Sequence, residues 1–305
     1  MNDVDFYLIL ERIQIQNANT ISSPITYGFP ALTGFLGAVH ALQRKLPFKV
    51  KLNFDGALIA CHDTKVKRFR PNRFNDYSFN QSRNPIKKDG KTASIIEEGK
   101  IDLTVSLIVP IICDDLDDVD WLSNNKKDFE TWAGNALLQQ RLAGGSVFGL
   151  NRAELISQET LDEQKTTLAP AFVLMDATSD LIEITETLKQ QRPESTELDA
   201  LIEVATLNHT PITDEKGKLE WKTSSVKQGR GWLVPMPVGF QGISPLFDAG
   251  EMLDSRSSEY PNQFVEALYG LGKWVFPYSI PSLKDAFWKM STSDDDLYLI
   301  QQIKD

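Results

Sequence analysis

The chain has 305 residues, of which 41% are hydrophobic and 24% are charged, so wholesale disorder is excluded and one or two packed domains are expected. A formal net charge of -10 at pH 7 argues against indiscriminate binding to nucleic acid. The N-terminus lacks the basic region and cleavage site of a signal peptide, and no apolar run approaches the length of a membrane span. Cys61 and Cys113 are far apart in sequence, and we expect buried, reduced thiols in a cytoplasmic protein with no membrane partner.

The first predicted elements are a strand over 5–16 and a helix over 32–42. Alternation along the strand separates a mainly apolar face from a face that begins apolar and ends polar. The apolar face holds Tyr7, Ile9, Ile13 and Ile15. The other face holds Phe6, Leu8, Leu10, Arg12, Gln14 and Gln16. Because polar residues end this second face, and the turn-rich segment 17–31 follows, we expect that end of the strand to be exposed or functional.

The helix over 32–42 has a core stripe at helical spacing and small residues on its opposite side. The stripe consists of Leu32, Phe35, Leu36, Val39 and Leu42. The opposite side carries Gly34, Gly37, Ala38 and Ala41. A solvent-facing helix would carry Lys and Glu there, so this side is predicted to allow close approach of another part of the chain or of a partner.

A second strand is predicted over 48–61, broken near Asp55 and Gly56, and a basic arm follows over 64–94. Between Lys65 and Lys91 there are nine basic and two acidic residues, a local net charge of +7. Aromatic residues are interleaved with these bases: Phe69, Phe74, Tyr77 and Phe79. Charges beside stacking surfaces suit single-stranded nucleic acid. A solvated loop, or an arm that anchors to a partner protein, remains an alternative.

The next predicted elements are a central strand over 101–112 and a helix over 126–142 that ends in the glycine loop LAGGSVFG (142–149). A closing strand over 168–175 follows. This is the ferredoxin-like (RRM-like) βαββαβ order, so the predicted class is α+β. The head covers 1–176, with the basic arm inserted, and a C-terminal α/β extension covers 177–305. In the extension, helices are predicted over 180–191, 197–207 and 262–275, a surface loop over 210–229 and β structure over 229–246.

No metal or cofactor is expected. The histidines, His40, His62 and His209, are not spaced as metal ligands, and the acidic runs at 114–120 and 294–296 fit solvated loops better than cation sites. His40 at the edge of the helix stripe is the one candidate catalyst: it could be the general base of a metal-independent ribonuclease, with Tyr27 or a basic residue assisting. A boundary histidine satisfied by a hydrogen bond is the favoured alternative.

Five segments together resemble a known family. They are 12–44, 82–99 (SRNPIKKDGKTASIIEEG), 141–146 (RLAGGS), 231–240 (GWLVPMPVGF) and 264–274 (FVEALYGLGKW). On these segments the chain is similar to the family of the second Csy protein of type I-F CRISPR surveillance (Csy/Cascade) complexes, a family of the RAMP superfamily. The resemblance implies a non-catalytic subunit that binds the 5′ handle of the CRISPR RNA, with a ferredoxin-like head and a thumb-like insertion.

The resemblance also implies partners. The subunit would form a heterodimer with the large subunit at the tail of the assembly and abut a helical backbone subunit. It would support RNA-guided DNA targeting in antiviral defence, with target DNA near the PAM as a further possible partner. The metal-independent ribonuclease using His40 stays the alternative function.

The predicted RNA-binding residues fall into three groups. Those expected to contact base edges and sugar hydroxyls, because amides both donate and accept, are Arg12, Gln14, Gln16, Asn17 and Asn19. Those expected on phosphates in the arm are Arg68, Arg70, Arg73, Arg83, Asn84, Lys87 and Lys88. Those expected to let the RNA approach the backbone closely are Gly144, Gly145 and Ser146.

Overall fold

The computed structural model describes residues 4–213, 217–293 and 296–303 and divides the chain into two compact units. The first unit consists of Met1–Val173, Phe276–Lys289 and Ile303–Asp305, and the second of Leu174–Val275 and Met290–Gln302. The predicted extension over 177–305 therefore contributes Phe276–Lys289 to the first unit. Asp294 and Asp295 of the second acidic run lie outside the described residues.

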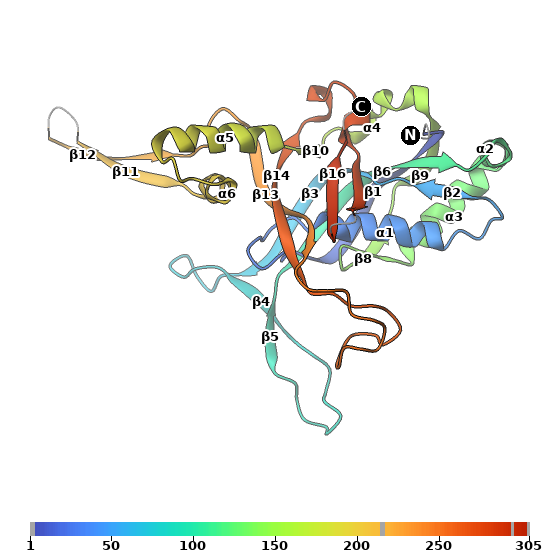
Figure 1. The fold of residues 1–305 in the computed structure, drawn as a ribbon, viewed down its shortest axis with the longest axis horizontal. Helices are drawn as coiled ribbons and strands as arrows, with labels where there is room; N and C mark the ends of the chain where they lie inside the picture. Colours follow the sequence, from blue (N-terminus) through green and yellow to red (C-terminus); the bar gives the residue numbers. More distant parts are fainter. Residues whose placement is uncertain (1–3, 214–216, 294–295, 304–305) are drawn as a thin grey trace. The chain divides into compact units, whose positions relative to one another are not determined.

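An antiparallel sheet forms the centre of the first unit (Figure 1). Its strand order is β10-β3-β6-β1-β8-β7, and every neighbouring pair in this order is antiparallel. The bounds are β1 Phe6–Asn19, β3 Leu58–Phe69, β6 Lys100–Cys113, β7 Arg141–Leu142, β8 Gly145–Gly149 and β10 Phe172–Asp176. Two more strands join this sheet: β2 (Leu52–Phe54) pairs with β6, and β9 (Arg152–Ser157) pairs with the first half of β1.

The closing strand differs from the prediction. Leu168, the first residue of the predicted strand, is the last residue of a short helix, α4 (Lys165–Leu168). The strand that follows is β10, and it pairs with β3 rather than with β1. The neighbours of β1 on its other side are β8 and β9. The neighbour of β1 that was expected over 168–175 is thus β8, which directly follows the glycine turn. The sequence analysis missed β9 because its sequence, RAELIS, is short and half polar.

Two bulges in β1 change which residues share a face. The register with β6 shifts between Leu10 and Ile13 and again between Ile15 and Ala18. Arg12 and Asn17, in these gaps, have positive φ values of 50° and 58°. Each extra residue reverses the alternation of the strand, so the prediction that Tyr7 and Ile9 lie with Ile13 and Ile15 is wrong. The residues on one face are Phe6, Leu8, Leu10, Ile13, Ile15 and Ala18, and those on the other include Tyr7, Ile9, Gln14 and Asn19.

Polar side chains of β6 hold both bulges. The Arg12 amide donates to Ser106 Oγ at 2.9 Å, and the Asn17 amide donates to Asp102 Oδ1 at 3.0 Å. These bonds satisfy backbone donors that the irregular register removes from the ladder. Segment 276–289 covers the start of the Tyr7 face, where the Tyr7 and Phe287 rings stack with centroids 5.3 Å apart. The far end of the same face carries the polar residues.

Helix α1 (Leu32–Arg44) confirms the predicted core stripe, since Leu32, Phe35, Leu36, Val39 and Leu42 are all buried. On its opposite side another part of the chain approaches closely at Gly34, as the small residues there predicted. Ala38 is buried, and a Cβ on Gly34 would lie 2.8 Å from the Ala143 backbone. Gly37 alone faces open space, with nothing within 4 Å of a built Cβ.

The acidic run at 114–120 is not a solvated loop. It begins helix α2 (Leu116–Asn124), and Asp115 caps it by accepting from the Asp118 amide at 3.0 Å. Carboxylates at a helix N-terminus interact favourably with the helix dipole, which accounts for the composition of this run. Helix α3 (Lys126–Leu138) then ends four residues before the predicted boundary.

The second unit contains two helices and an antiparallel sheet. Helices α5 (Thr178–Gln191) and α6 (Glu197–Ala205) form a buried cluster with Leu233 and Leu271 of strands β13 (Trp232–Gly242) and β14 (Val265–Val275). In its sheet β13 lies between β14 and β16 (Leu297–Gln302), and β15 (Trp288–Ser293) is next to β16. The segment predicted as a loop over 210–229 contains most of a hairpin, β11 (Asn208–Thr213) and β12 (Leu219–Ser224).

The predicted helix over 262–275 is wrong, because this segment is β14. Its apolar residues fit either period, but glycines at 270 and 272 disfavour a helix. A Cβ on Gly272 would lie 2.5 Å from the Met236 sulfur, so the Met236 side chain of β13 packs closely over this glycine. Within the described part of the chain, no helix combines the length and apolarity that a membrane span needs.

Candidate nucleic-acid interface

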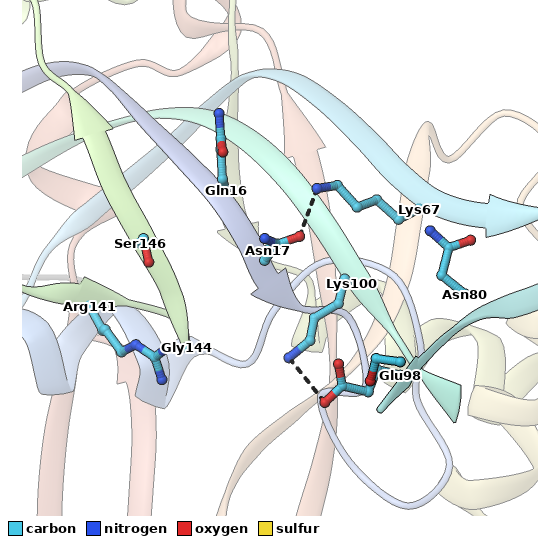
Figure 2. A pocket seen from close by; sticks show the side chains of 10 residues that line it. Gln16, Asn17, Lys67, Asn80, Glu98, Lys100, Arg141, Gly144 and Ser146 are labelled. Atoms are coloured by element: carbon cyan, nitrogen blue, oxygen red, sulfur yellow. Dashed lines mark hydrogen bonds and ion pairs between the residues drawn. The ribbon is translucent and has the colours of Figure 1, made fainter. Parts of the chain in front are cut away.

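A polar cavity of about 530 Å³ lies in the first unit where β1 ends (Figure 2). Strands β4 (Ser78–Arg83) and β5 (Ile95–Glu98), which form the base of the basic arm, line one part of it. The β7–β8 turn lines another. Its lining residues are Gln16, Asn17, Lys67, Asn80, Ser82, Glu98, Lys100, Arg141, Gly144 and Ser146. Three features that the sequence singled out separately, the polar strand end, the arm and the glycine loop, therefore meet at one cavity.

The second bulge of β1, at Asn17, places polar side chains along one side of the cavity. Lys67 Nζ donates to Asn17 Oδ1 at 2.6 Å and pairs with Asp102 Oδ1 at 3.0 Å. Desolvation raises the pKa of Asp102, but hydrogen bonds from the Asn17 amide and from Lys67 outweigh it and hold this pKa below its ordinary value. Asp102 is therefore a fixed anion that positions Lys67 and Asn17.

The two glycines of the loop have different roles. Gly144 has φ of 79° at the β7–β8 turn and lines the cavity. A Cβ on Gly145 would lie 2.6 Å from Ile15 Cγ2 and 2.7 Å from the Gln16 carbonyl oxygen, so this glycine lets β8 pair with β1. That pairing sets Ser146 opposite Gln16. Gly145, predicted to approach RNA, instead contacts the chain's own backbone.

Two cavity lysines lie directly opposite each other in the sheet. Lys67 of β3 is the register partner of Lys100 of β6. Like charges in this arrangement destabilise a sheet, and here Asp102 and Glu98 offset them only in part. Lys100 Nζ is 4.0 Å from the nearer Glu98 oxygen. Lys67 and Lys100 carry two positive charges and Asp102 and Glu98 two negative ones, so the excess positive charge at the cavity comes from Arg141.

Five polar side chains of the lining have unused hydrogen-bonding capacity. Among the described residues, no hydrogen bond or ion pair engages the side chains of Gln16, Asn80, Ser82, Arg141 and Ser146. Polar groups gathered around a cavity without partners in the chain are available to a polar ligand.

The arm forms two separate groups of charges. The turn between β3 and β4 and the longer loop between β4 and β5 project in different directions (Figure 1). At the first, the guanidinium carbons of Arg68 and Arg70 lie 3.9 and 5.0 Å from the Tyr77 ring centroid, and Arg73 lies over Phe74. A hydrogen bond from Arg70, with the charges of Arg68 and Arg70, lowers the pKa of Tyr77. Arg83 ends β4, and the exposed loop after it carries Asn84, Lys87 and Lys88.

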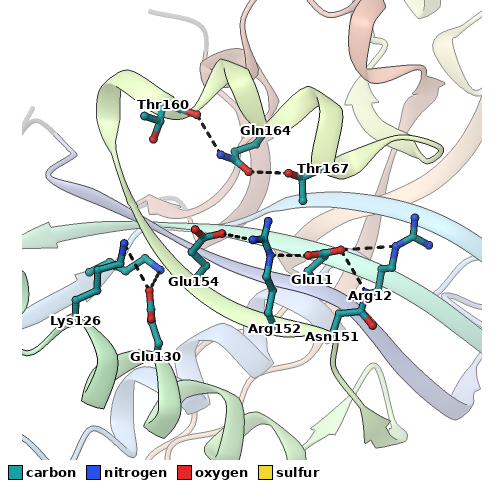
Figure 3. Close-up of polar contacts among 11 residues, drawn as sticks. Glu11, Arg12, Lys126, Glu130, Asn151, Arg152, Glu154, Thr160, Gln164 and Thr167 are labelled. Carbon is teal, nitrogen blue, oxygen red and sulfur yellow. Dashed lines mark hydrogen bonds and ion pairs between the residues drawn. The ribbon is translucent and has the colours of Figure 1, made fainter.

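The remaining predicted contacts lie outside the cavity lining. Asn19 uses its side chain within its own turn, donating to the Ile21 carbonyl at 2.8 Å. Gln14 is exposed on β1 opposite Thr104. Arg12 belongs to a charged network on the sheet (Figure 3), where Glu11 pairs with it at 3.8 Å and with Arg152 at 2.7 Å.

Several lining residues were missed from the sequence. They are Lys67, Asn80, Ser82, Glu98, Lys100 and Arg141. Lys67 and Asn80 stand in the predicted basic arm, and Ser82, Glu98 and Arg141 stand in the matched segments 82–99 and 141–146, so each of these had a signal. Lys100 directly follows the matched segment 82–99, and the pairing of β4 with β5 sets Asn80 opposite Glu98.

His40 is exposed on α1, and within the described residues its side chain has neither a hydrogen bond nor an ion pair. The expectation that a hydrogen bond satisfies it is therefore wrong. His40 is not part of the cavity lining, and Tyr27, its suggested helper, packs on Phe79 with ring centroids 5.2 Å apart. In the part of the chain that the structure describes, no three His, Cys, Asp or Glu side chains are grouped as a metal site would require.

Comparison with known proteins decides the family. The family model described as CRISPR-associated protein (Cas_Csy2) matches residues 8–300. The chain belongs to the Csy2 family. A curated relative from Pseudomonas aeruginosa (strain UCBPP-PA14), named CRISPR-associated protein Csy2, is 37% identical over 306 residues, covering 94% of this chain and 92% of that protein. The type I-F Csy2 resemblance is thus confirmed at the level of the family.

Proposed function

We propose that this Csy2-family chain, as a subunit of the type I-F Csy complex, holds the 5′ handle of the CRISPR RNA in the polar cavity at the end of β1. The observation that carries the proposal is the lining itself: two cross-strand lysines and five polar side chains without partners in the described chain. An RNA strand supplies the phosphates, sugar hydroxyls and base edges that such groups bind.

The lining separates two tasks. Lys67 and Arg141 neutralise phosphates, and Gly144 lets the RNA backbone pass close to the β7–β8 turn. The amides of Gln16 and Asn80 donate and accept together, as base edges require. The loop carrying Lys87 and Lys88 extends this positive surface beyond the cavity, and Arg83 stands where it leaves β4.

The rest of the proposal follows the family. The sheet order β3-β6-β1-β8, with a helix after β1 and helices after β6, supports a ferredoxin-like head. On this view the large subunit and a helical backbone subunit flank the chain, which works without catalysis in the cytoplasm during RNA-guided antiviral defence.

Direct binding tests the proposal. We would measure fluorescence anisotropy of a labelled handle RNA with the full chain, and with its large-subunit partner, for wild type and Arg141→Gln. Loss of one phosphate contact should weaken binding and reduce the log–log salt slope by about 0.7. Arg44→Gln, which removes the same charge from the exposed end of α1, is the matched control. Equal affinity and salt slope for Arg141→Gln and Arg44→Gln would reject the cavity as the RNA site.

A further inference from the structure

One side chain of the cavity lining, that of Glu98, is not expected in a site that binds only phosphate. Glu98 is the single carboxylate of the lining, and its side chain is 38% exposed. A carboxylate repels phosphate, so its presence indicates that this part of the cavity meets hydrogen-bond donors. In RNA the donors that face a protein pocket are the N–H groups of unpaired bases.

Glu98 and Lys100 are held as a pair. Their side chains point toward each other from either side of Gly99 (Figure 2), with 4.0 Å between Lys100 Nζ and the Glu98 oxygen. A Cβ on Gly99 would lie 2.3 Å from Thr20 Oγ1, and the Gly99 carbonyl accepts from the Thr20 amide at 3.1 Å. The backbone between the two charged residues is therefore fixed by packing. Asn80 is the register partner of Glu98 and places a free amide beside it.

This pair presents a donor next to two acceptors. The Watson–Crick edge of guanine is its complement: the O6 oxygen accepts, and N1–H and N2–H both donate. A lysine donates to O6 while one carboxylate accepts from both N–H groups. Adenine and cytosine present one amino group beside a ring nitrogen that accepts, and uracil presents one N–H between two carbonyls. Each of these leaves a carboxylate oxygen facing an acceptor.

Accordingly, we propose that Glu98 and Lys100 bind the Watson–Crick edge of an unpaired guanine in single-stranded RNA. The inference rests on the proposed RNA function of the cavity and names the base that this part of it reads. The phosphates on either side of the guanine then lie toward Lys67 and Arg141.

A set of nonamer RNAs tests the inference. The probes are nine-residue oligoadenylates whose central base is guanine, inosine, adenine, cytosine or uracil, and their affinities for the full chain are measured by anisotropy. A bidentate base contact predicts about tenfold or greater preference for guanine over adenine. Inosine, which lacks the N2 amino group, should bind several-fold more weakly than guanine but more tightly than adenine.

Glu98→Gln has one acceptor instead of two and should remove most of the guanine preference. Glu97→Gln is the matched control, since Glu97 is exposed and alternates to the other face of β5. Thermal melting of both variants verifies that they fold. Equal affinity for all five RNAs, equal affinity for guanine and inosine, or a guanine preference that Glu98→Gln leaves unchanged would overturn the guanine assignment while RNA binding stands. No binding of any RNA would overturn the proposed function and this inference with it.

Discussion

Lys67 and Lys100 are direct cross-strand neighbours on β3 and β6, and both line the polar cavity. Two positive charges directly opposite each other lower the stability of a sheet, so removing one of them is expected to relieve electrostatic repulsion. The Asn17–Asp102 contacts anchor Lys67, whereas Lys100 has only the 4.0 Å contact with Glu98. Each lysine therefore has a carboxylate partner, and that of Lys100 is the more distant of the two.

Replacing Lys100 should separate stability from binding. We expect Lys100→Met to leave the free energy of unfolding unchanged or raise it by about 0.2–0.5 kcal/mol, because the like-charge contact disappears. RNA affinity should fall, since one cation of the cavity is lost. Urea unfolding and anisotropy measure the two effects, with Lys49→Met, at an exposed site, as the control. A variant that is destabilised yet binds RNA normally would show that Lys100 serves the fold.

The glycines of β8 and α1 should respond oppositely to alanine. Gly145→Ala puts a Cβ within 3 Å of Gln16 and Ala18 backbone atoms, so β8 must move away from β1, and we expect a loss of roughly 1–3 kcal/mol. Gly37 lies on an exposed part of α1 with open space around it. Gly37→Ala should stabilise the isolated chain by about 0.5–1 kcal/mol because alanine favours the helix. Melting curves of the two variants make the comparison, and a stable Gly145→Ala would contradict the close β1–β8 pairing.

His62 should make the fold sensitive to acid. Its Nε2 lies 2.7 Å from the buried Ser106 Oγ, and burial, together with the nearby Arg12 charge, lowers the pKa of His62 below its ordinary 6.5. The folded state therefore binds fewer protons than the unfolded state below that pH. The stabilising contribution is complete above pH 6.5 and is lost progressively as the pH falls toward the folded-state pKa.

Urea unfolding at pH 7.5, 6.5 and 5.5 measures this effect. Wild type should lose more stability between pH 7.5 and 5.5 than His62→Gln, which cannot take up the proton. Parallel pH profiles for the two proteins would mean that His62 titrates alike in the folded and unfolded states.

The sequence predicted the order of the main elements but not the irregularities that build the site. Period-2 alternation located β1, a nearly continuous apolar run located β6, and period-3.6 spacing located α1. The bulges at Arg12 and Asn17 depend on acceptors 94 and 85 residues away, Ser106 and Asp102, so no local pattern could reveal them. The first bulge moves Gln14 from the predicted Phe6 face to the Tyr7 face, and the second restores the original alternation at Ala18 and Asn19.

The site residues that could be predicted lie in two short stretches, the polar end of β1 and the glycine loop. Gln16, Asn17, Gly144 and Ser146 were all predicted and line the cavity. Glu98 was not predicted, since an acidic residue near a basic arm gives no sign of RNA contact. Glu98 lies two residues before Lys100, and its place opposite Asn80 follows from the pairing of β4 with β5, which composition does not specify.

The two groups of charges on the arm should contribute differently to RNA binding. Arg68 and Arg70 lie over Tyr77, whereas Arg83, Lys87 and Lys88 are exposed and, among the described residues, their side chains have no ion-pair partner. We expect the triple change of Arg83, Lys87 and Lys88 to alanine to reduce the log–log salt slope of handle binding by about 2, since each single-strand phosphate contact contributes about 0.7. The triple change of Arg44, Lys45 and Lys49 to alanine removes three exposed positive charges from the end of α1 and the loop after it, and should leave the slope unchanged. If both triple variants lower the slope equally, long-range net charge accounts for the effect, and the β4–β5 loop does not contact the RNA.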